Sequence, residues 1–285
     1  MAYPQIAAFA RLANGNVAPS RSIAGQATKI GRAAHDVNYD EVNDEIILAS
    51  ANGQAIVTLP GGANGDTPAR RIIQGPKTQI QSPGYGATVD AVHDEIFLVE
   101  GRDRPGDEYI LVFPRTANGD VAPIRVIKGP DTMLKGARSA AVDPIRNLLA
   151  VGASSGILIF NRTDSGNVKP RAIIRGPGSG GNFRLIPSKG WIVTARTGGG
   201  DDDGGDGERG GRGGGGGGRD GGGRAPRGIA VWSITDNGDV PPVFVLNNPN
   251  GGIRAGRVAL NPNGKEVILG GRTFVEVYSF PEIFN

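Results

Sequence analysis

The sequence has 285 residues, a formal net charge of +3 and no cysteine. The absence of cysteine excludes disulfides and thiolate metal sites, and so small a charge gives no support for binding to nucleic acid or an anionic membrane. No apolar run is long enough to cross a membrane, and no secretory leader is recognisable. We therefore expect either an extracytoplasmic protein whose signal has been removed, which we favour, or a cytoplasmic one.

The chain begins with two short strand-like segments, "QIAAFA" (residues 5–10) and "RSIAG" (residues 21–25). Between them lies an Asn-Gly turn followed by a proline, a phrase that recurs through the whole chain. Outside a Gly-rich block at residues 198–223, successive copies are about 50 residues apart, the length of one four-stranded propeller blade. The turn glycines are Gly15, Gly65, Gly119, Gly166 and Gly238.

Each repeat contains four short strands, as the third repeat illustrates at residues 137–143, 147–152, 156–160 and 171–176. The first strand is small and apolar, and the second is an unbroken apolar run typical of a strand buried on both faces. The Asn-Gly turn supplies the positive φ that a tight hairpin between the third and fourth strands requires. The proline after the turn removes a backbone donor, which we interpret as protection of the blade's outer edge.

These patterns predict an all-β chain forming a single β-propeller domain over residues 1–285, with the Gly-rich block 198–223 as a loop insertion. We favour five antiparallel four-stranded blades. The last repeat ends with a third strand, so "RSIAG" is expected to close the ring as its fourth strand. "QIAAFA" is then surplus, as an extra edge strand or a strand that pairs with a neighbouring molecule. The alternative is six blades, with two strands supplied by a partner or by sequence absent here.

The unit "VDAVHDEIFLVE…YILVFPRTANGDVAPIRVIKGPDT", Val89 to Thr132, resembles the repeat of bacterial NHL-type and YVTN-type β-propeller proteins. This resemblance extends over nearly the whole chain apart from the Gly-rich block, and it implies the propeller fold. It does not choose a function, because the family includes scaffolds, protein-binding and RNA-binding modules and a few metal-dependent enzymes.

Acidic residues recur between the first and second strands of the repeats. Asp40, Asp44 and Glu45 match Asp90, Asp94 and Glu95 in the next repeat, and later repeats carry Asp143, Asn147 and Asn261. Paired carboxylates can act as acid/base groups or calcium ligands. Once per blade, however, such residues are separated around the ring and are suited to accepting hydrogen bonds from the turn's own backbone. We favour this turn role.

A second set of polar residues lies five positions before the turn acids, where the inner strand begins near the mouth of the central channel. His35, Tyr85 and Arg138 share this register, and glycine occupies it in the other two repeats. Such a ring could bind a small anion or a polar partner group, or be ordinary loop polarity, which we favour. The long loop at residues 101–108 and the Gly-rich block are expected at the same face. The candidate partner-binding residues are His35, Tyr85, Arg102, Asp103, Arg104, Arg138, Arg209 and Arg212.

The Gly-rich block partly resembles an RGG box, yet it holds six acidic residues against three arginines and no aromatic side chain on which bases could stack. It also lacks the period of Gly-Asp calcium repeats. We expect a flexible loop first, a contact with an assembly or partner second, and nucleic acid or calcium binding last.

The sequence therefore predicts a non-enzymatic scaffold or protein-interaction module without a cofactor, with a protein or a second copy as partner and with an extracellular self-assembly as one form of that role. The alternative is a propeller that binds a small ligand or carbohydrate at the channel mouth. Both tryptophans, Trp191 and Trp232, lie within strands, which weakens the carbohydrate version. A metal-dependent, lactonase-like hydrolase would need a channel carboxylate set, and we identify none in the sequence.

Overall fold

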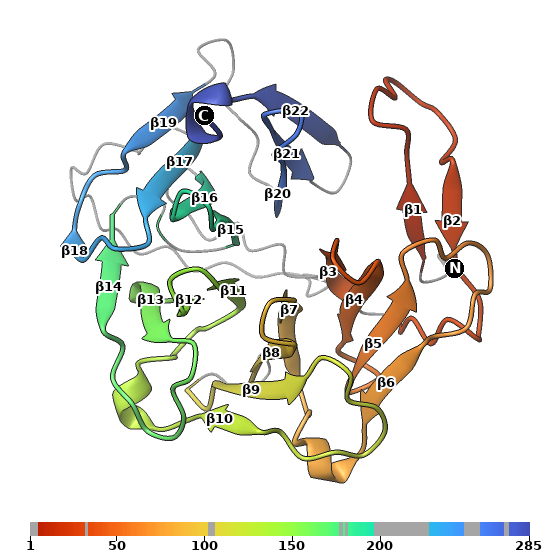
Figure 1. Ribbon diagram of the computed structural model, residues 1–285, viewed down its shortest axis with the longest axis horizontal. Coiled ribbons are helices and arrows are strands. Elements are labelled where there is room, and N and C mark those ends of the chain that lie inside the picture. Colours follow the sequence, from red (N-terminus) through yellow and green to blue (C-terminus); the bar gives the residue numbers. More distant parts are fainter. Residues whose placement is uncertain are drawn as a thin grey trace, which may run out of the picture.

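Five antiparallel sheets surround a central axis as a five-bladed β-propeller (Figure 1). This confirms the predicted all-β fold and its five blades. The computed structural model describes residues 5–31, 34–101, 106–176, 179, 182–196, 228–247, 257–270 and 274–285. The Gly-rich block lies outside the described residues.

The blades follow one another along the chain, and within each blade the first strand is nearest the axis (Figure 1). Blade 1 contains β3 (Ala34–Asp40), β4 (Glu45–Ser50), β5 (Ala55–Pro60) and β6 (Arg71–Gln74). Blade 2 contains β7 (Pro83–Asp90), β8 (Glu95–Glu100), β9 (Tyr109–Pro114) and β10 (Arg125–Ile127). Blade 3 contains β11 (Ser139–Asp143), β12 (Leu148–Ala153), β13 (Gly156–Asn161) and β14 (Ala172–Arg175).

Blades 4 and 5 complete the ring. Blade 4 contains β15 (Phe183–Ile186), β16 (Trp191–Arg196), β17 (Gly228–Ser233) and β19 (Phe244–Asn247), and the short β18 (Gly238–Asp239) pairs in parallel with β14 of blade 3. Blade 5 contains β20 (Arg257–Asn261), β21 (Glu266–Gly270) and β22 (Val275–Ser279). A separate hairpin joins β1 (Ile6–Ala8) to β2 (Arg21–Ile23). Short 3-10 helices lie at Pro76–Thr78, Pro130–Thr132 and Pro281–Ile283.

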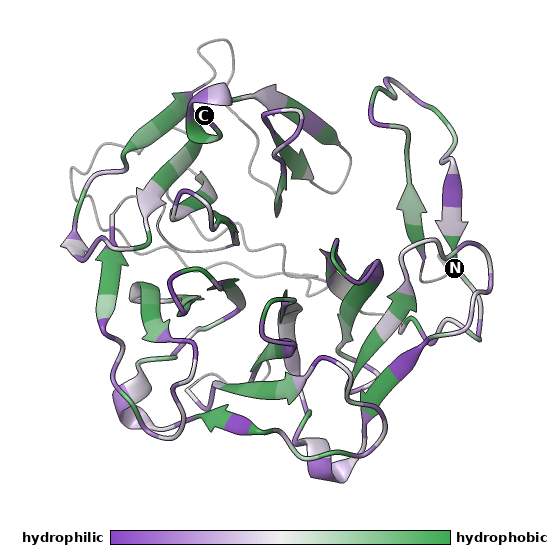
Figure 2. Cartoon of the chain, in the orientation of Figure 1, coloured by the Kyte–Doolittle hydropathy of each residue, from purple (hydrophilic) through white to green (hydrophobic). Residues whose placement is uncertain are grey.

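The hydrophobic core is divided into clusters that lie between adjoining blades. Val112 of blade 2, for example, packs in one cluster with Leu149 and Val151 of blade 3. The second strands β4, β8 and β12 are buried at every position, as their unbroken apolar runs predict. Figure 2 shows hydrophobic residues concentrated along the strands and hydrophilic ones in the connecting turns. Because each fully buried aliphatic or aromatic side chain contributes about 1.5–3 kcal/mol, these faces hold the ring together.

The Asn-Gly turns have a second role that the sequence did not reveal. Gly119 adopts φ +81°, as a tight turn requires, and its N–H donates to the Ile72 carbonyl on the preceding blade at 2.7 Å. The Asn118 side chain accepts from the Ile72 N–H at 2.9 Å. The same parallel bridge joins Ile127 to Gly166. β6 and β10 are the terminal strands of their sheets, as the interpretation of the phrase as edge protection expects, and the bridge to the following turn is an additional contact of that edge.

The first acid of each turn acts as the favoured interpretation requires, whereas Asp44 accepts from the Tyr39 hydroxyl and Asp94 from the Arg115 guanidinium. Asp90 Oδ1 accepts hydrogen bonds from the backbone N–H groups of Val92 and His93, at 3.0 and 3.1 Å. Asp40 and Asp143 make the corresponding pairs of bonds in blades 1 and 3. In blades 1, 2 and 3 the carboxylate of this first acid is thus used by its own turn.

The glutamates that follow these turns join neighbouring blades. Arg125 of blade 2 donates to Glu95 through two bonds of 2.7 Å, and Arg162 of blade 3 reaches the same carboxylate at 2.6 Å. Glu45 of blade 1 likewise receives Arg115 of blade 2 at 3.1 Å. Burial disfavours the ionised form of Glu95, but Arg125 and Arg162 outweigh it and hold its pKa below the ordinary value.

The predicted closure of the ring by residues 21–25 is wrong. β2 pairs with β1, from Ile6 opposite Ile23 to Ala8 opposite Arg21, and in the described residues β22 pairs only with β21. A hairpin between segments so close in the chain costs far less loop-closure entropy than pairing the two ends of the chain. The surplus strand thus retains its own local partner.

Candidate functional site

The predicted channel-mouth register coincides with two irregularities in the inner strands. The pairing of β3 with β4 shifts between Ala34 and Val37, which brackets His35, and that of β7 with β8 shifts between Pro83 and Ala87, which brackets Tyr85. Such bulges re-aim side chains and are common beside functional sites. The described residues do not include the His35 and Tyr85 side chains.

The backbone brings this register together on adjoining blades. The Arg138 carbonyl lies 3.1 Å from where a Cβ on Gly84 would lie, and Arg138 itself is half-buried. A Cβ on Gly86 would approach the Asp36 Cβ to 2.8 Å, so glycine permits blades 1 and 2 to pack closely here. The other members of the predicted face, Arg102, Asp103, Arg104, Arg209 and Arg212, lie outside the described residues.

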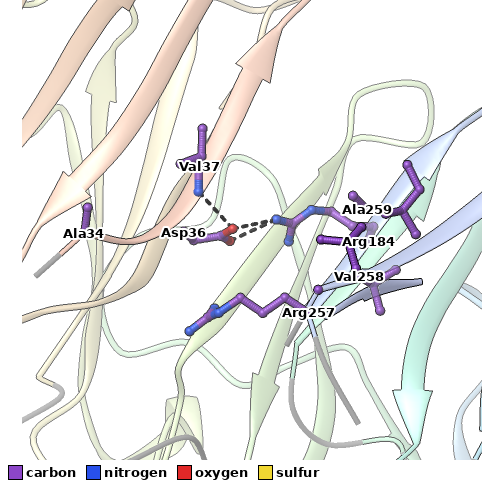
Figure 3. Close-up of a pocket in the computed structure, with 10 residues that line it drawn as sticks. Ala34, Asp36, Val37, Arg184, Arg257, Val258 and Ala259 are labelled. Carbon is purple, nitrogen blue, oxygen red and sulfur yellow. Dashed lines mark hydrogen bonds and ion pairs between the residues drawn. The ribbon is translucent and has the colours of Figure 1, made fainter. Parts of the chain in front are cut away.

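A cavity of about 340 Å³ lies beside this register, between the inner strand of blade 1 and blades 4 and 5 (Figure 3). Arg184 Nη2 lies 2.8 and 3.0 Å from the two Asp36 carboxylate oxygens, an ion pair that joins blade 4 to blade 1 across the axis. Arg257 of blade 5 lines the same cavity (Figure 3). Most of the remaining lining is aliphatic, from Val37, Val258, Ile268 and Val275 among others.

Sequence reasoning missed these charged residues by a small margin. Asp36 and Arg257 directly follow His35 and Gly256, positions that we placed in the channel-mouth register. The signal that could have found them is alternation, because the next residue of a strand points to the opposite face. The pairing of Asp36 with Arg184, which are 148 positions apart, follows only from the ring geometry.

Blade 5 exposes an apolar face whose counterparts in blades 2, 3 and 4 are buried. Where the third strand pairs with the second, Val277 lies two residues before the last paired residue of β22. Val112, Ile159 and Val231 occupy the same register position in blades 2, 3 and 4. Those three are at most 1% exposed, whereas Val277 is 50% and Val275 71% exposed. The buried equivalents belong to clusters shared with the following blade.

Blade 1 exposes the face of its inner strand that in other blades packs against the preceding blade. Val37 and Tyr39 of β3 are 42% and 53% exposed. Ala87 and Val258, which correspond to Val37 in blades 2 and 5, are 0% and 2% exposed and pack against the preceding blade. We call the two faces together, Val37 and Tyr39 with Val275 and Val277, the seam. The cavity in Figure 3 lies at its inner end, because Val37 and Val275 both line that cavity.

One buried acid near the predicted face is not used by any ion pair given above. Glu100, at the end of β8, is fully buried, and its Oε2 accepts from the N–H groups of Gln81 and Ser82 at 3.1 and 2.8 Å. Burial raises its pKa to about 7, despite these hydrogen bonds. Within the residues described above, no three His, Cys, Asp or Glu side chains are grouped to hold a metal ion, and no helix could span a membrane.

Comparison with known proteins identifies the architecture and no family. No protein-family model matches the chain, and no curated protein matches it. Among solved structures, the WD40 β-propeller domain of Doa1 aligns with 96% of this chain and 71% of its own length, at 15% sequence identity and a TM-score of 0.55.

Two further structures are similar. A hydrazine synthase from Kuenenia stuttgartiensis aligns with 86% of this chain and 58% of its own length, at 11% identity and a TM-score of 0.50. A Bacteroides uniformis protein, provisionally assigned as a 6-phosphogluconolactonase, aligns with 98% of this chain and 74% of its own length, at 16% identity and a TM-score of 0.49. At 15% identity the likeness to the Doa1 domain supports the propeller fold alone, and it decides neither the repeat type nor whether the chain is an enzyme.

Proposed function

We propose that this β-propeller is a non-enzymatic scaffold that binds another protein at the seam. The observation that carries the proposal is the exposure of Val275 and Val277, at 71% and 50%, where the corresponding residues of the other blades are buried against a neighbour. The proposal rests on this contrast between equivalent positions and not on exposure alone.

The side chains of the seam are better suited to contact with a protein partner than to contact with water. Val37 and Tyr39 on one side and two valines on the other form an apolar surface in which Tyr39 offers its ring, while its hydroxyl donates to Asp44 Oδ1 at 2.7 Å. Large exposed apolar patches on soluble proteins commonly mark interaction sites, and tyrosine is enriched among the residues that contribute most to binding.

Site-directed photo-crosslinking in the native host tests the proposal. A photoreactive phenylalanine analogue at Val277 should capture a specific protein, whereas the same analogue at Val92, which is 69% exposed on a blade 2 turn, should not. Binding of the purified partner should then fall at least tenfold in Val277→Asp and remain unchanged in Val92→Asp. Crosslinks at Val92 with none at Val277 would show that the interaction surface lies elsewhere.

A second candidate function is binding of a small anion in the cavity. Its volume of about 340 Å³ is in the range of small-ligand pockets, and Arg184 and Arg257 both line it. Arginine binds carboxylate and phosphate through paired hydrogen bonds, so such a ligand would compete with Asp36 for Arg184. Titration with inorganic phosphate tests this function: saturable binding that Arg184→Gln abolishes would favour it, and no binding at millimolar phosphate would reject it.

Three finer parts of the sequence interpretation belong to this proposal. We propose an NHL-type or YVTN-type repeat, an extracytoplasmic location and, as one form of the scaffold role, self-assembly. Electron microscopy of native material tests the last part, because a fibre or array would be seen directly and isolated particles would reject it.

A further inference from the structure

The β1–β2 hairpin has the internal register of the outer half of a blade. The Ser20 N–H donates to the Ala8 carbonyl at 2.8 Å. The same bond, at 2.8 Å, joins Arg70 to Thr58 in blade 1, Ile124 to Val112 in blade 2 and Arg171 to Ile159 in blade 3. β1 therefore corresponds to a third strand and β2 to a fourth.

The hairpin also makes the contact that joins the outer strand of a blade to the turn of the following blade. Ile23 of β2 forms a parallel bridge to Gly65, the turn glycine of blade 1, as Ile73 does to Gly119 and Ile127 to Gly166. With respect to blade 1, the hairpin occupies the position of a preceding blade.

A second contact places the hairpin after blade 5. Arg11, three residues after Ala8 as Arg115 is after Val112 and Arg162 after Ile159, forms a 2.7 Å ion pair with Glu266 of β21. Arg115 and Arg162 follow the third strands of blades 2 and 3 in the same way, and each binds the corresponding glutamate of the blade before it, Glu45 or Glu95. In Figure 1 the hairpin stands between blade 5 and blade 1, in agreement with both contacts.

The inner edge of β1 is an open strand edge in the part of the chain that the structure describes. In every other blade the third strand pairs with a second strand on that side, whereas β1 has β2 as its only neighbour. The Ala8 carbonyl points to β2, so in an antiparallel pair the N–H and C=O of Ala7 point the other way, toward the axis.

We propose that the protein binds a partner's β-hairpin in the seam, with one partner strand pairing antiparallel to β1; this inference rests on the proposed function. The seam then completes a sixth blade, with its third and fourth strands from this chain and its first and second from the partner. An added strand satisfies the β1 backbone groups, and its two faces are covered by Val275 and Val277 on one side and Val37 and Tyr39 on the other. The partner strand must be apolar on both faces, as β4 and β8 are.

A synthetic peptide with the sequence of residues 84–101, the first two strands of blade 2 and their turn, is a suitable probe. Fluorescence anisotropy should show saturable binding to the intact protein. Ala7→Pro should weaken that binding at least tenfold, because it removes the N–H that faces the partner and leaves the bonds to β2 in place. Ala7→Ser, which retains the N–H, is the matched control and should change binding less than twofold.

Hydrogen exchange distinguishes strand pairing from simple apolar contact. The Ala7 amide should become protected when the peptide binds, and thermal melting should verify that Ala7→Pro remains folded. Equal affinity of wild type and Ala7→Pro, or no peptide binding at all, would overturn strand pairing. A captured partner at Val277 would still support the proposed function in that case, so the two failures are distinguishable. A stable dimer of the purified protein whose seam is protected would also overturn the inference, because a second copy would then occupy the seam.

Discussion

The interface between blades 2 and 3 and the seam are built from similar residues in the same register, yet only the first is closed. Val112 is fully buried by blade 3, whereas Val277, its counterpart on blade 5, is 50% exposed. The difference arises from the neighbour and not from the residue, because each blade supplies only half of an interface. Apolar side chains in a propeller strand are thus evidence of a neighbour, inside the chain or outside it.

The largest expected effect separates the two regions directly. Val112→Asp places a charge in a closed core and should destabilise the protein by more than about 4 kcal/mol, whereas Val277→Asp should change stability by less than about 0.5 kcal/mol. Urea denaturation followed by tryptophan fluorescence measures both. If the aspartate prevents folding, Val112→Ala, expected to cost about 2 kcal/mol, can be compared with Val277→Ala. Equal losses at the two positions would mean that the monomer covers its own seam.

The ion pairs between blades sharpen the comparison. Glu95→Gln leaves Arg125 and Arg162 without their buried carboxylate and should cost about 3 kcal/mol of folding stability. Glu266→Gln, whose partner Arg11 has a side chain that is 57% exposed, should cost less than about 1 kcal/mol.

Because the Glu95 pKa is lowered, its stabilisation is present above the ordinary carboxyl pKa and is lost as the pH falls below it. Urea titrations at pH 7 and pH 3.5 measure this, and a loss at Glu266 as large as that at Glu95 would contradict it.

Glu100 provides a pH-dependent test in the closed part of the ring. Its pKa is about 7 in the folded protein, above the ordinary value of 4.5, so its contribution to stability is full below 4.5 and is lost as the pH rises through 7. Glu100→Gln should therefore raise stability by about 2–3 kcal/mol at pH 8.5 and have little effect at pH 4.5. Melting temperatures across this range decide the matter; an identical pH dependence of the two proteins would exclude a buried, neutral Glu100.

The smallest expected effect concerns the Gly-rich block. Replacing residues 198–223 with a four-residue turn removes no apolar core and should change stability by less than about 0.5 kcal/mol. The deletion should also leave the affinity of the 84–101 peptide unchanged within twofold. A marked gain in affinity would show that the block covers the seam, and unfolding would show that it is structural. If the block contacts a native partner, as predicted, association with that partner should weaken.

The repeated phrase was sufficient to predict the strands, the five blades and the turn role of Asp90, because these depend on residues close together in the chain. Closure could not be predicted in this way, since β2 has two possible third-strand partners and local pairing with β1 prevails. The Asp36–Arg184 ion pair was missed for a related reason: nothing local to either residue indicates the other. The seam became visible only when equivalent positions of different blades were compared for exposure.

The bond from the turn of one blade to the preceding blade, made at Gly119, Gly166 and Gly238, has a consequence for how such a ring can change in evolution. The turn around Gly119 belongs to blade 2, but it finishes the outer strand of blade 1. A duplicated segment of one repeat length therefore contains one outer strand that needs such a bond and one turn that can supply it. This holds wherever in the repeat the segment begins and ends. The number of blades can change by recombination without redesign of such a junction, since the junctions that follow blades 1, 2 and 3 all pair an isoleucine of the outer strand with a turn glycine.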